Sequence, residues 1–136
     1  MKSEEFEVIT SDLKKRRIPI EVKQVVSIMM DKKAEGVVVL KLKGVTDMTD
    51  FLVICHGHST RQNSAICDEI HKKLSRQFKR KPYGVEGERE ADWILMDYVD
   101  FVVHIFLEDT RQRYALEKLW MDAKRYNFYP GQQSKG

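Results

Sequence analysis

Pairs of aspartate residues are the first feature of this sequence that could do chemistry. Asp97 with Asp100, and Asp47 with Asp50, could each hold a divalent cation for phosphoryl transfer. Such catalysis usually requires an Asp-x-Asp spacing on one strand, which neither pair has. Aspartate also forms turns, because its carboxylate accepts hydrogen bonds from nearby backbone amides. We therefore interpret both pairs as turn residues, and a metal-dependent nucleotidyltransferase-like enzyme that uses Asp97 and Asp100 remains the alternative.

Histidine and cysteine residues offer a second kind of chemistry. His56 and His58 alternate beside Cys55 and could supply two metal ligands, but no third ligand is fixed by spacing, so we interpret them as loop histidines. Cys55 and Cys67 both lie in apolar stretches, which predicts buried, reduced thiols rather than nucleophiles. His104 lies within an apolar strand and is expected to be a hydrogen-bonded structural residue. We expect no catalytic residue, no metal and no cofactor.

Aromatic residues in the second half of the chain indicate recognition rather than catalysis. Tryptophan and tyrosine dominate binding hot spots, because they bury a large area with few rotatable bonds. Trp120 is expected in the core. Trp93 opens a strand directly after an acidic loop, so we expect it at a sheet edge, where exposure together with Tyr98 would create an interaction patch.

These residues need an α/β domain to position them. Apolar spacing predicts a first helix over 19–35, and Ser59 or Thr60 is expected to cap a long helix that ends near 78. Strands are predicted at 37–42, 51–55, 83–86, 93–97 and 101–107, which gives a mixed sheet of about five strands flanked by helices. A last helix is predicted from Asp109 or Thr110 to about 124, with an inward stripe of Leu116, Leu119, Trp120 and Ala123.

Composition limits the class of protein. The 136 residues, 42% of them hydrophobic, suffice for one core, and we expect a single domain at 18–125 between flexible segments 1–17 and 126–136. No apolar run reaches the roughly 18 residues of a membrane span, and the N-terminus lacks an apolar signal region. These features predict a soluble cytoplasmic protein.

Charge is distributed unevenly along the chain. The net charge of +3 is too small to identify a nucleic-acid-binding protein. However, residues 71–81 carry six basic and no acidic side chains, whereas residues 82–109 carry eight acidic side chains and one arginine. This segregation predicts one basic and one acidic surface.

Four segments, read in order, resemble a known family. They are DFLVICHGHSTRQ at 50–62, GVEG at 84–87, DWILMDYVDFVVHIF at 92–106 and RYALEKLW at 113–120. Together they closely resemble the ribosomal silencing factor family, also called Iojap. The likeness extends over roughly residues 22–123, so it includes nearly the whole predicted domain.

The resemblance implies a fold and a function. The fold would be similar to a nucleotidyltransferase core without the catalytic carboxylates, and the protein would not be an enzyme. Family members bind the large ribosomal subunit through ribosomal protein L-fourteen and sterically block its association with the small subunit. They thereby lower translation when nutrients are limiting. A minor contact of the basic stretch with ribosomal RNA, and a homodimer of the free protein, are left open.

The resemblance also assigns roles to particular residues. Trp93, Tyr98 and Tyr114 match motif positions and are expected to contact the partner. Asp97, Asp100, Arg113 and Glu117 are expected to form a polar frame around them. The family usually has glycine where this chain has Val99, which puts the geometry of that turn in question, because a β-branched residue resists a positive φ.

Overall fold

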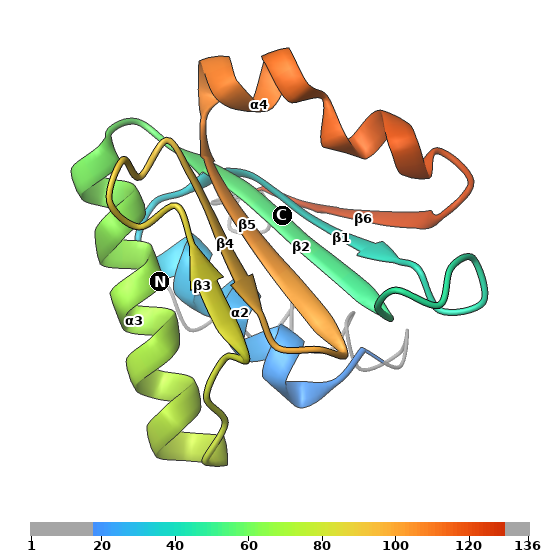
Figure 1. Ribbon diagram of the computed structural model, residues 1–136, viewed down its shortest axis with the longest axis horizontal. Coiled ribbons are helices and arrows are strands. Elements are labelled where there is room, and N and C mark those ends of the chain that lie inside the picture. The colour runs from blue at the N-terminus through green and yellow to red at the C-terminus, as the bar shows by residue number, and fades with distance from the viewer. Residues whose placement is uncertain (1–17, 130–136) are drawn as a thin grey trace, which may run out of the picture.

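The computed structural model describes residues 18–129, which form a mixed six-stranded sheet with helices against it (Figure 1). The helices are α2 (Ile20–Asp31), α3 (Thr60–Phe78) and α4 (Glu108–Tyr114), followed by a short 3-10 helix, η1 (Leu116–Trp120). The strands are β1 (Glu35–Lys41), β2 (Phe51–Gly57), β3 (Gly84–Glu86), β4 (Trp93–Asp97), β5 (Phe101–Leu107) and β6 (Lys124–Phe128). The predicted α/β class is confirmed, with one strand more than expected.

The strand order places a parallel pair at the centre of the sheet. The order is β3-β4-β5-β2-β1-β6, in which β2 and β5 are parallel and every other neighbouring pair is antiparallel. Helices α2 and α3 pack on one face, while α4 and η1 lie over the other (Figure 1). None of the helices among residues 18–129 is long and apolar enough to cross a membrane.

Both faces of the sheet are apolar, which divides the core into two parts. Successive strand residues point to opposite faces. In β1, Val37 and Val39 therefore pack with the helical layer, whereas Val38 and Leu40 belong to the second cluster under η1. Both cysteines are free and buried, and burial raises the pKa of each thiol to about 12, as expected for core residues. The smaller cluster is the one that borders the candidate site.

The last predicted helix is wrong beyond Tyr114. Ala115 adopts the left-handed conformation with φ +47° and ends α4, after which the chain forms η1 and then returns as β6 along the edge of β1. Leu119, expected to point inward, is 71% exposed, and Trp120 is half-buried against the second core cluster. Helical spacing of apolar residues occurs here without a continuous helix, because sheet pairing takes the last residues.

Two predicted boundaries also shift. The first helix ends at Asp31 rather than near 35, because Lys33 takes a positive φ and the chain enters β1 at Glu35. The predicted domain end at 125 falls inside β6, which continues to a buried Phe128. The predicted flexible segment 1–17, and residues 130–136 of the predicted tail, lie outside the described residues.

The turn between β4 and β5 retains the conformation that glycine would favour. Val99 has φ +77°, and the amide of Asp100 donates to the carbonyl of Tyr98 at 3.0 Å, which closes a γ-turn around Val99. The Thr49 hydroxyl also donates to the Val99 carbonyl at 3.0 Å, which fixes the turn against the loop before β2. A β-branched residue therefore occupies a strained position while its side chain remains 63% exposed.

We expect Val99→Gly to stabilise the protein. Relief of the left-handed strain contributes roughly 1–2 kcal/mol, and the greater freedom of glycine in the unfolded chain offsets about 0.4–1 kcal/mol. The net gain of about 1 kcal/mol should raise the melting temperature by roughly 4 °C in calorimetry. Val45→Gly is the matched control, because this exposed valine has no positive φ and should lose stability. A Val99→Gly protein that melts below wild type would contradict the strain argument.

Candidate partner-binding surface

Four aromatic rings gather on the sheet face that α2 and α3 do not cover. Trp93 opens β4 opposite Phe106 of β5, and the ring centroids are 5.0 Å apart. His104, two residues before Phe106, points to the same face, and its ring lies 6.0 Å from those of Trp93 and Phe106. Tyr114, from the end of α4, closes the group with its ring 4.8 Å from Trp93. The alternation of side chains along β4 and β5, together with the end of α4, thus brings the four rings into one aromatic cluster.

A hydrogen bond fixes the indole of Trp93 in this cluster. Its Nε1–H donates to Nδ1 of His104 at 3.0 Å, so the imidazole is neutral and carries its proton on Nε2. Burial lowers the pKa of His104 to about 4, which keeps the imidazole an acceptor at neutral pH. The structural role expected for His104 is therefore confirmed, and it consists of orienting Trp93.

Part of the cluster is open to solvent. Trp93 is half-buried, and Tyr114 is 54% exposed. β3 pairs only with residues 95–97 of β4, so among residues 18–129 no strand lies outside Trp93 at this end of the sheet. Partial exposure of Trp93 at a local sheet edge is thus confirmed. We call Trp93 and Tyr114 the aromatic surface; Leu119 and Met121 extend the exposed apolar character along the chain after α4.

Tyr98 does not belong to this surface, and its expected exposure is wrong. Strand alternation places Tyr98 with Ile94 and Met96 on the helical face, and its side chain is 1% exposed. The ring stacks on Phe101 at 4.8 Å, and the guanidinium of Arg80 lies 5.8 Å from its centroid. The odd spacing between residues 93 and 98 is the sequence signal that separates them.

The two aspartates of the alternative enzyme hypothesis are engaged in structural contacts. Oδ1 of Asp97 accepts from the amide of Val99 at 2.8 Å, which confirms its interpretation as a turn residue. Oδ1 of Asp100 accepts from Arg80 Nη2 at 2.7 Å. Arg80 also donates to the Tyr98 carbonyl, so the turn is attached to the end of α3. Asp97 and Asp100 therefore hold this turn and not Trp93 and Tyr114, so the polar frame expected from them is wrong for these two residues.

Arg111 of α4 makes a network that sequence reasoning missed. Its Nη1 donates to the carbonyl of Gly36 at 2.7 Å and to Nδ1 of His56 at 3.0 Å. Its Nε and Nη2 bind both carboxylate oxygens of Glu117, at 3.1 and 2.9 Å, and Glu117 also pairs with Arg125 of β6 at 3.0 Å. We call these five residues the Arg111 network.

The arginines of this network favour the ionised form of Glu117. Burial opposes ionisation of Glu117, but the hydrogen bond and charge of Arg111 outweigh it, so the pKa of Glu117 lies below its usual value. Gly36 has φ +59°, and a Cβ there would meet Arg111 Nη1 at 2.5 Å, so any other residue would strain the backbone and displace the guanidinium. Glu117 thus has the expected frame role, whereas Arg113 is exposed and lies 5.8 Å from the centroid of Tyr114.

The contact with Arg111 also fixes which ring nitrogen of His56 carries the proton. An arginine only donates hydrogen bonds, so Nδ1 of His56 must accept and Nε2 must carry the proton. Nε2 faces Glu35 at 3.7 Å, and Nε2 of His58 lies 3.3 Å from the same carboxylate. A protonated Nε2 cannot bind a metal, so this arrangement does not provide two histidine ligands. His56 is a strand residue, not the loop residue that we expected.

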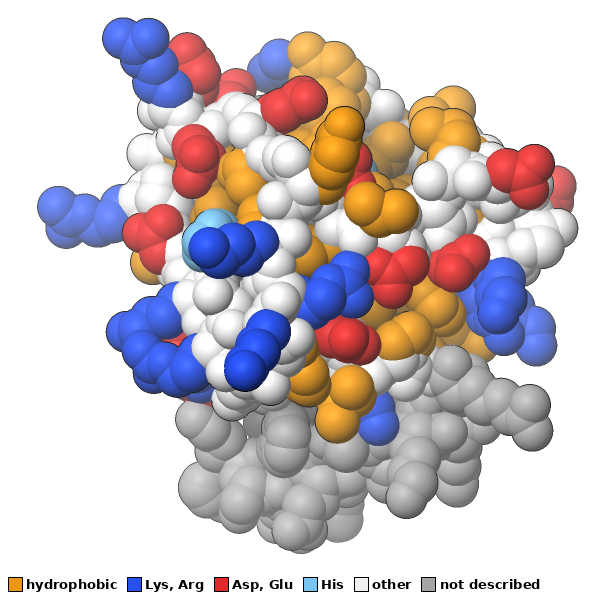
Figure 2. Space-filling model, turned by 60° about the horizontal axis from the view of Figure 1, so that its bottom comes forward, with side chains coloured by type: hydrophobic (Ala, Val, Ile, Leu, Met, Phe, Trp, Pro, Cys, Tyr) orange, Lys and Arg blue, Asp and Glu red, His pale blue; other side chains and the backbone are white. Residues whose placement is uncertain are grey.

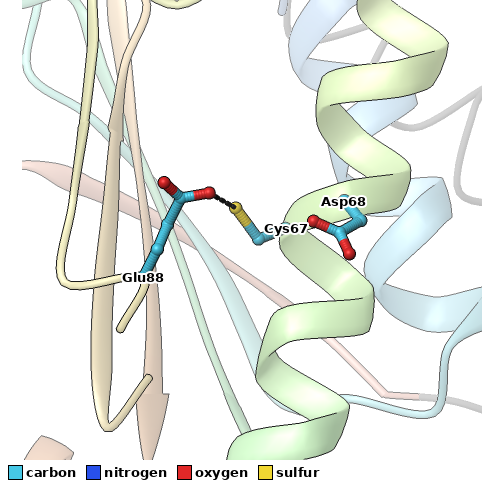
Figure 3. Close-up of side chains that lie close together, drawn as sticks. All are labelled: Cys67, Asp68 and Glu88. Carbon is cyan, nitrogen blue, oxygen red and sulfur yellow. Dashed lines mark hydrogen bonds between the residues drawn. The ribbon is translucent and has the colours of Figure 1, made fainter. Parts of the chain in front are cut away.

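Within residues 18–129, one group of potential metal ligands comes together. Ligand atoms of Cys67, Asp68 and Glu88 lie within 4.8 Å of one another, and the Cys67 thiol donates to a Glu88 oxygen at 4.0 Å (Figure 3). Burial, followed by the charges of Glu88 and Asp68, raises the pKa of this thiol to about 12. A neutral thiol beside two exposed carboxylates is a poor metal ligand set.

Comparison with known proteins identifies the family. The sequence matches the family described as "Ribosomal silencing factor during starvation" over residues 15–135. The chain belongs to the ribosomal silencing factor family. The resemblance inferred from the four motifs is therefore confirmed.

Relatives of the ribosomal silencing factor family are found in bacteria and in eukaryotic organelles. The chain is 47% identical over 93 residues to "Ribosomal silencing factor RsfS" of Halalkalibacterium halodurans, covering 68% of this chain and 79% of the relative. It is 31% identical over 102 residues to mouse "Mitochondrial assembly of ribosomal large subunit protein 1", covering 74% of this chain and 45% of the mouse protein.

Two solved structures have the same fold. A crystal structure from Bacillus halodurans has a TM-score of 0.65 and 43% identity, covering 75% of this chain and 95% of that one. A crystal structure from Chromobacterium violaceum has a TM-score of 0.69 and 25% identity, covering 85% and 97% respectively.

Removal of the Arg111 guanidinium should destabilise the protein more than removal of the exposed guanidinium of Arg113. Arg111→Met leaves the Gly36 carbonyl, Nδ1 of His56 and Oε1 of Glu117 without their donor, which should lower the unfolding free energy by about 3 kcal/mol. Arg113→Met is the matched control and should change it by less than about 0.5 kcal/mol. Urea denaturation measures both. Similar midpoints for the two variants would show that the network contributes little to stability.

Acid should weaken the fold through His104. Because its folded pKa is about 4 and the unfolded value is 6.5, the unfolded chain binds the proton first as the pH falls. Stability is therefore complete above pH 6.5 and declines between pH 6.5 and 4, by about 3 kcal/mol in all. His104→Gln retains an acceptor for Trp93 and should remove most of this decline. The pKa of His56 is also lowered, so this residue accounts for the change of stability with pH that remains in the variant. An unchanged decline in the variant would contradict this assignment.

Proposed function

We propose that this chain represses translation by binding the large ribosomal subunit and blocking its association with the small subunit. The aromatic surface of Trp93 and Tyr114 carries the proposal. It is a partly exposed aromatic pair whose Trp93 is held in place by His104 and Phe106, and rigid aromatic side chains of this kind act as anchors in protein interfaces.

Charge next to this surface suggests the chemistry of the partner. Exposed acidic residues precede Trp93: Glu86 ends β3, and Glu88, Glu90 and Asp92 lie in the loop before β4, with Glu88 beside Cys67 of α3. Such a loop attracts a basic protein and repels RNA phosphates. Ribosomal protein L-fourteen, the partner implied by the family resemblance, is therefore the contact that we propose for the aromatic surface.

The names of relatives support a ribosomal role. Bacterial relatives are named ribosomal silencing factors, and the mouse relative is named for assembly of the large ribosomal subunit. We propose that the chain acts in the cytoplasm by occupancy rather than by catalysis and without a cofactor. The engagement of Asp97 and Asp100 with the backbone amide of Val99 and with Arg80 supports this mechanism.

We expect Tyr114→Ala to weaken binding to purified large subunits without unfolding the protein. An anchor at the centre of an interface typically contributes about 2 kcal/mol, which corresponds to roughly thirtyfold in Kd. Tyr83→Ala is the matched control, because Tyr83 is 84% exposed but lies at the β3 edge of the sheet. Melting temperatures of both variants should remain near wild type, and the Kd should change for Tyr114→Ala alone.

Inhibition of subunit joining should follow the same pattern. Wild-type protein added to free large subunits should prevent joining, whereas protein added after joining should have little effect. Tyr114→Ala should lose inhibition in parallel with binding. Equal inhibition in both orders of addition, or full inhibition by substoichiometric protein, would contradict a steric mechanism.

A further inference from the structure

The C-terminal half of α3 carries a second charged surface, on the opposite side of the sheet from the aromatic surface. Lys72 and Arg76 are exposed, and their spacing of four residues places them on one side of the helix; the exposed Lys79 follows as the left-handed C-cap. Ile66, Ile70 and Leu74, on the other side of α3, are buried in the core. Figure 2 shows lysine and arginine side chains gathered on the left, where α3 lies in Figure 1.

Two of the basic side chains at 71–81 form ion pairs within the protein, and the others do not. Of the six basic residues at 71–81, Lys73 pairs with Glu69 at 3.4 Å, and Arg80 binds Asp100 and Glu21. Lys72, Arg76, Lys79 and Lys81 make no ion pair with any described residue. We call these four residues the basic surface of α3.

We propose that the basic surface of α3 binds the phosphate backbone of ribosomal RNA while the aromatic surface binds a protein of the same subunit. This inference rests on the proposed function, because it takes the large subunit as the partner. Side chains three and four residues apart on a helix are about 5–6 Å apart at Cβ, so neighbouring charges can follow successive phosphates along one strand.

The surroundings of the basic surface favour RNA over a lipid membrane. A helix that binds a membrane inserts exposed apolar side chains beside its basic residues. The apolar side of α3 faces the core, and its stripe residues Ile66, Ile70 and Leu74 are fully buried. The exposed neighbours of Arg76 are the polar residues Gln77 and Lys79. On the helix itself the surface offers charge without an apolar anchor, which matches contacts to phosphate; the exposed Tyr83 follows α3, directly before β3.

The test measures how binding to purified large subunits depends on KCl concentration. Each lost phosphate contact reduces the slope of log affinity against log salt by about 0.7–0.9, so Lys72→Gln combined with Arg76→Gln should reduce it by about 1.5. The double variant should bind several-fold more weakly at low salt and approach wild type at high salt. Lys33→Gln with Lys43→Gln removes the same charge from exposed positions outside α3 and should leave the slope unchanged.

Two further binding measurements show whether ribosomal RNA or a ribosomal protein is responsible for any loss of affinity. With deproteinised large-subunit RNA as the probe, the Lys72 and Arg76 variant should again bind more weakly than the control variant. With isolated ribosomal protein L-fourteen, both variants should bind like wild type. A wild-type slope in the Lys72 and Arg76 variant, or an equal loss of binding to the isolated protein, would overturn the RNA contact. Failure of wild type to bind large subunits would instead refute the proposed function, and the RNA arm would still decide the role of α3.

Discussion

Arg111 makes the contact on which the sheet face opposite α2 and α3 depends. Its guanidinium joins the backbone of β1, the imidazole of His56 on β2 and the carboxylate of Glu117 on η1. Gly36, the acceptor on β1, is 75 residues from Arg111 in the chain. A largely buried cation is stable only while its acceptors remain in place, so the network holds α4 and η1 against the sheet. Through Arg125, Glu117 extends the same constraint to β6.

The geometry of the aromatic surface depends on the Arg111 network. Tyr114 ends α4, three residues after Arg111, and its ring reaches Trp93 because α4 cannot move away from the strand ends. Trp93 is fixed independently by the hydrogen bond to neutral His104 and by contact with Phe106. An interface built from side chains that are already ordered loses little conformational entropy on binding. The same two groups, Arg111 and His104, therefore support both stability and recognition.

Charge gives the molecule two different recognition surfaces. The acidic loop leads from Glu88, which lies beside Cys67 of α3, to Trp93 of the aromatic surface, whereas the basic surface begins at Lys72 of α3. The net charge of +3 does not reveal this arrangement, because the negative and positive charges of the two surfaces nearly cancel. A particle made of both RNA and basic proteins presents complementary partners to both surfaces, which is consistent with membership of the ribosomal silencing factor family.

The sequence by itself determined the elements whose signals are local. Apolar spacing predicted α3, β-branched and apolar runs predicted β1, β2 and β5, and the apolar surroundings of both cysteines predicted buried thiols. Strand alternation also contained the correct placement of Tyr98, since residues 93 and 98 must point to opposite faces. Only tertiary structure decided the path after Tyr114. Leu116, Leu119 and Trp120 have helical spacing, but the left-handed Ala115, the Arg111–Glu117 pair and the unpaired edge of β1 divert the chain into η1 and β6. The edge of β1 and the acceptors of Arg111 at Gly36 and His56 are far from these residues in the chain, and no local pattern of side chains records those contacts.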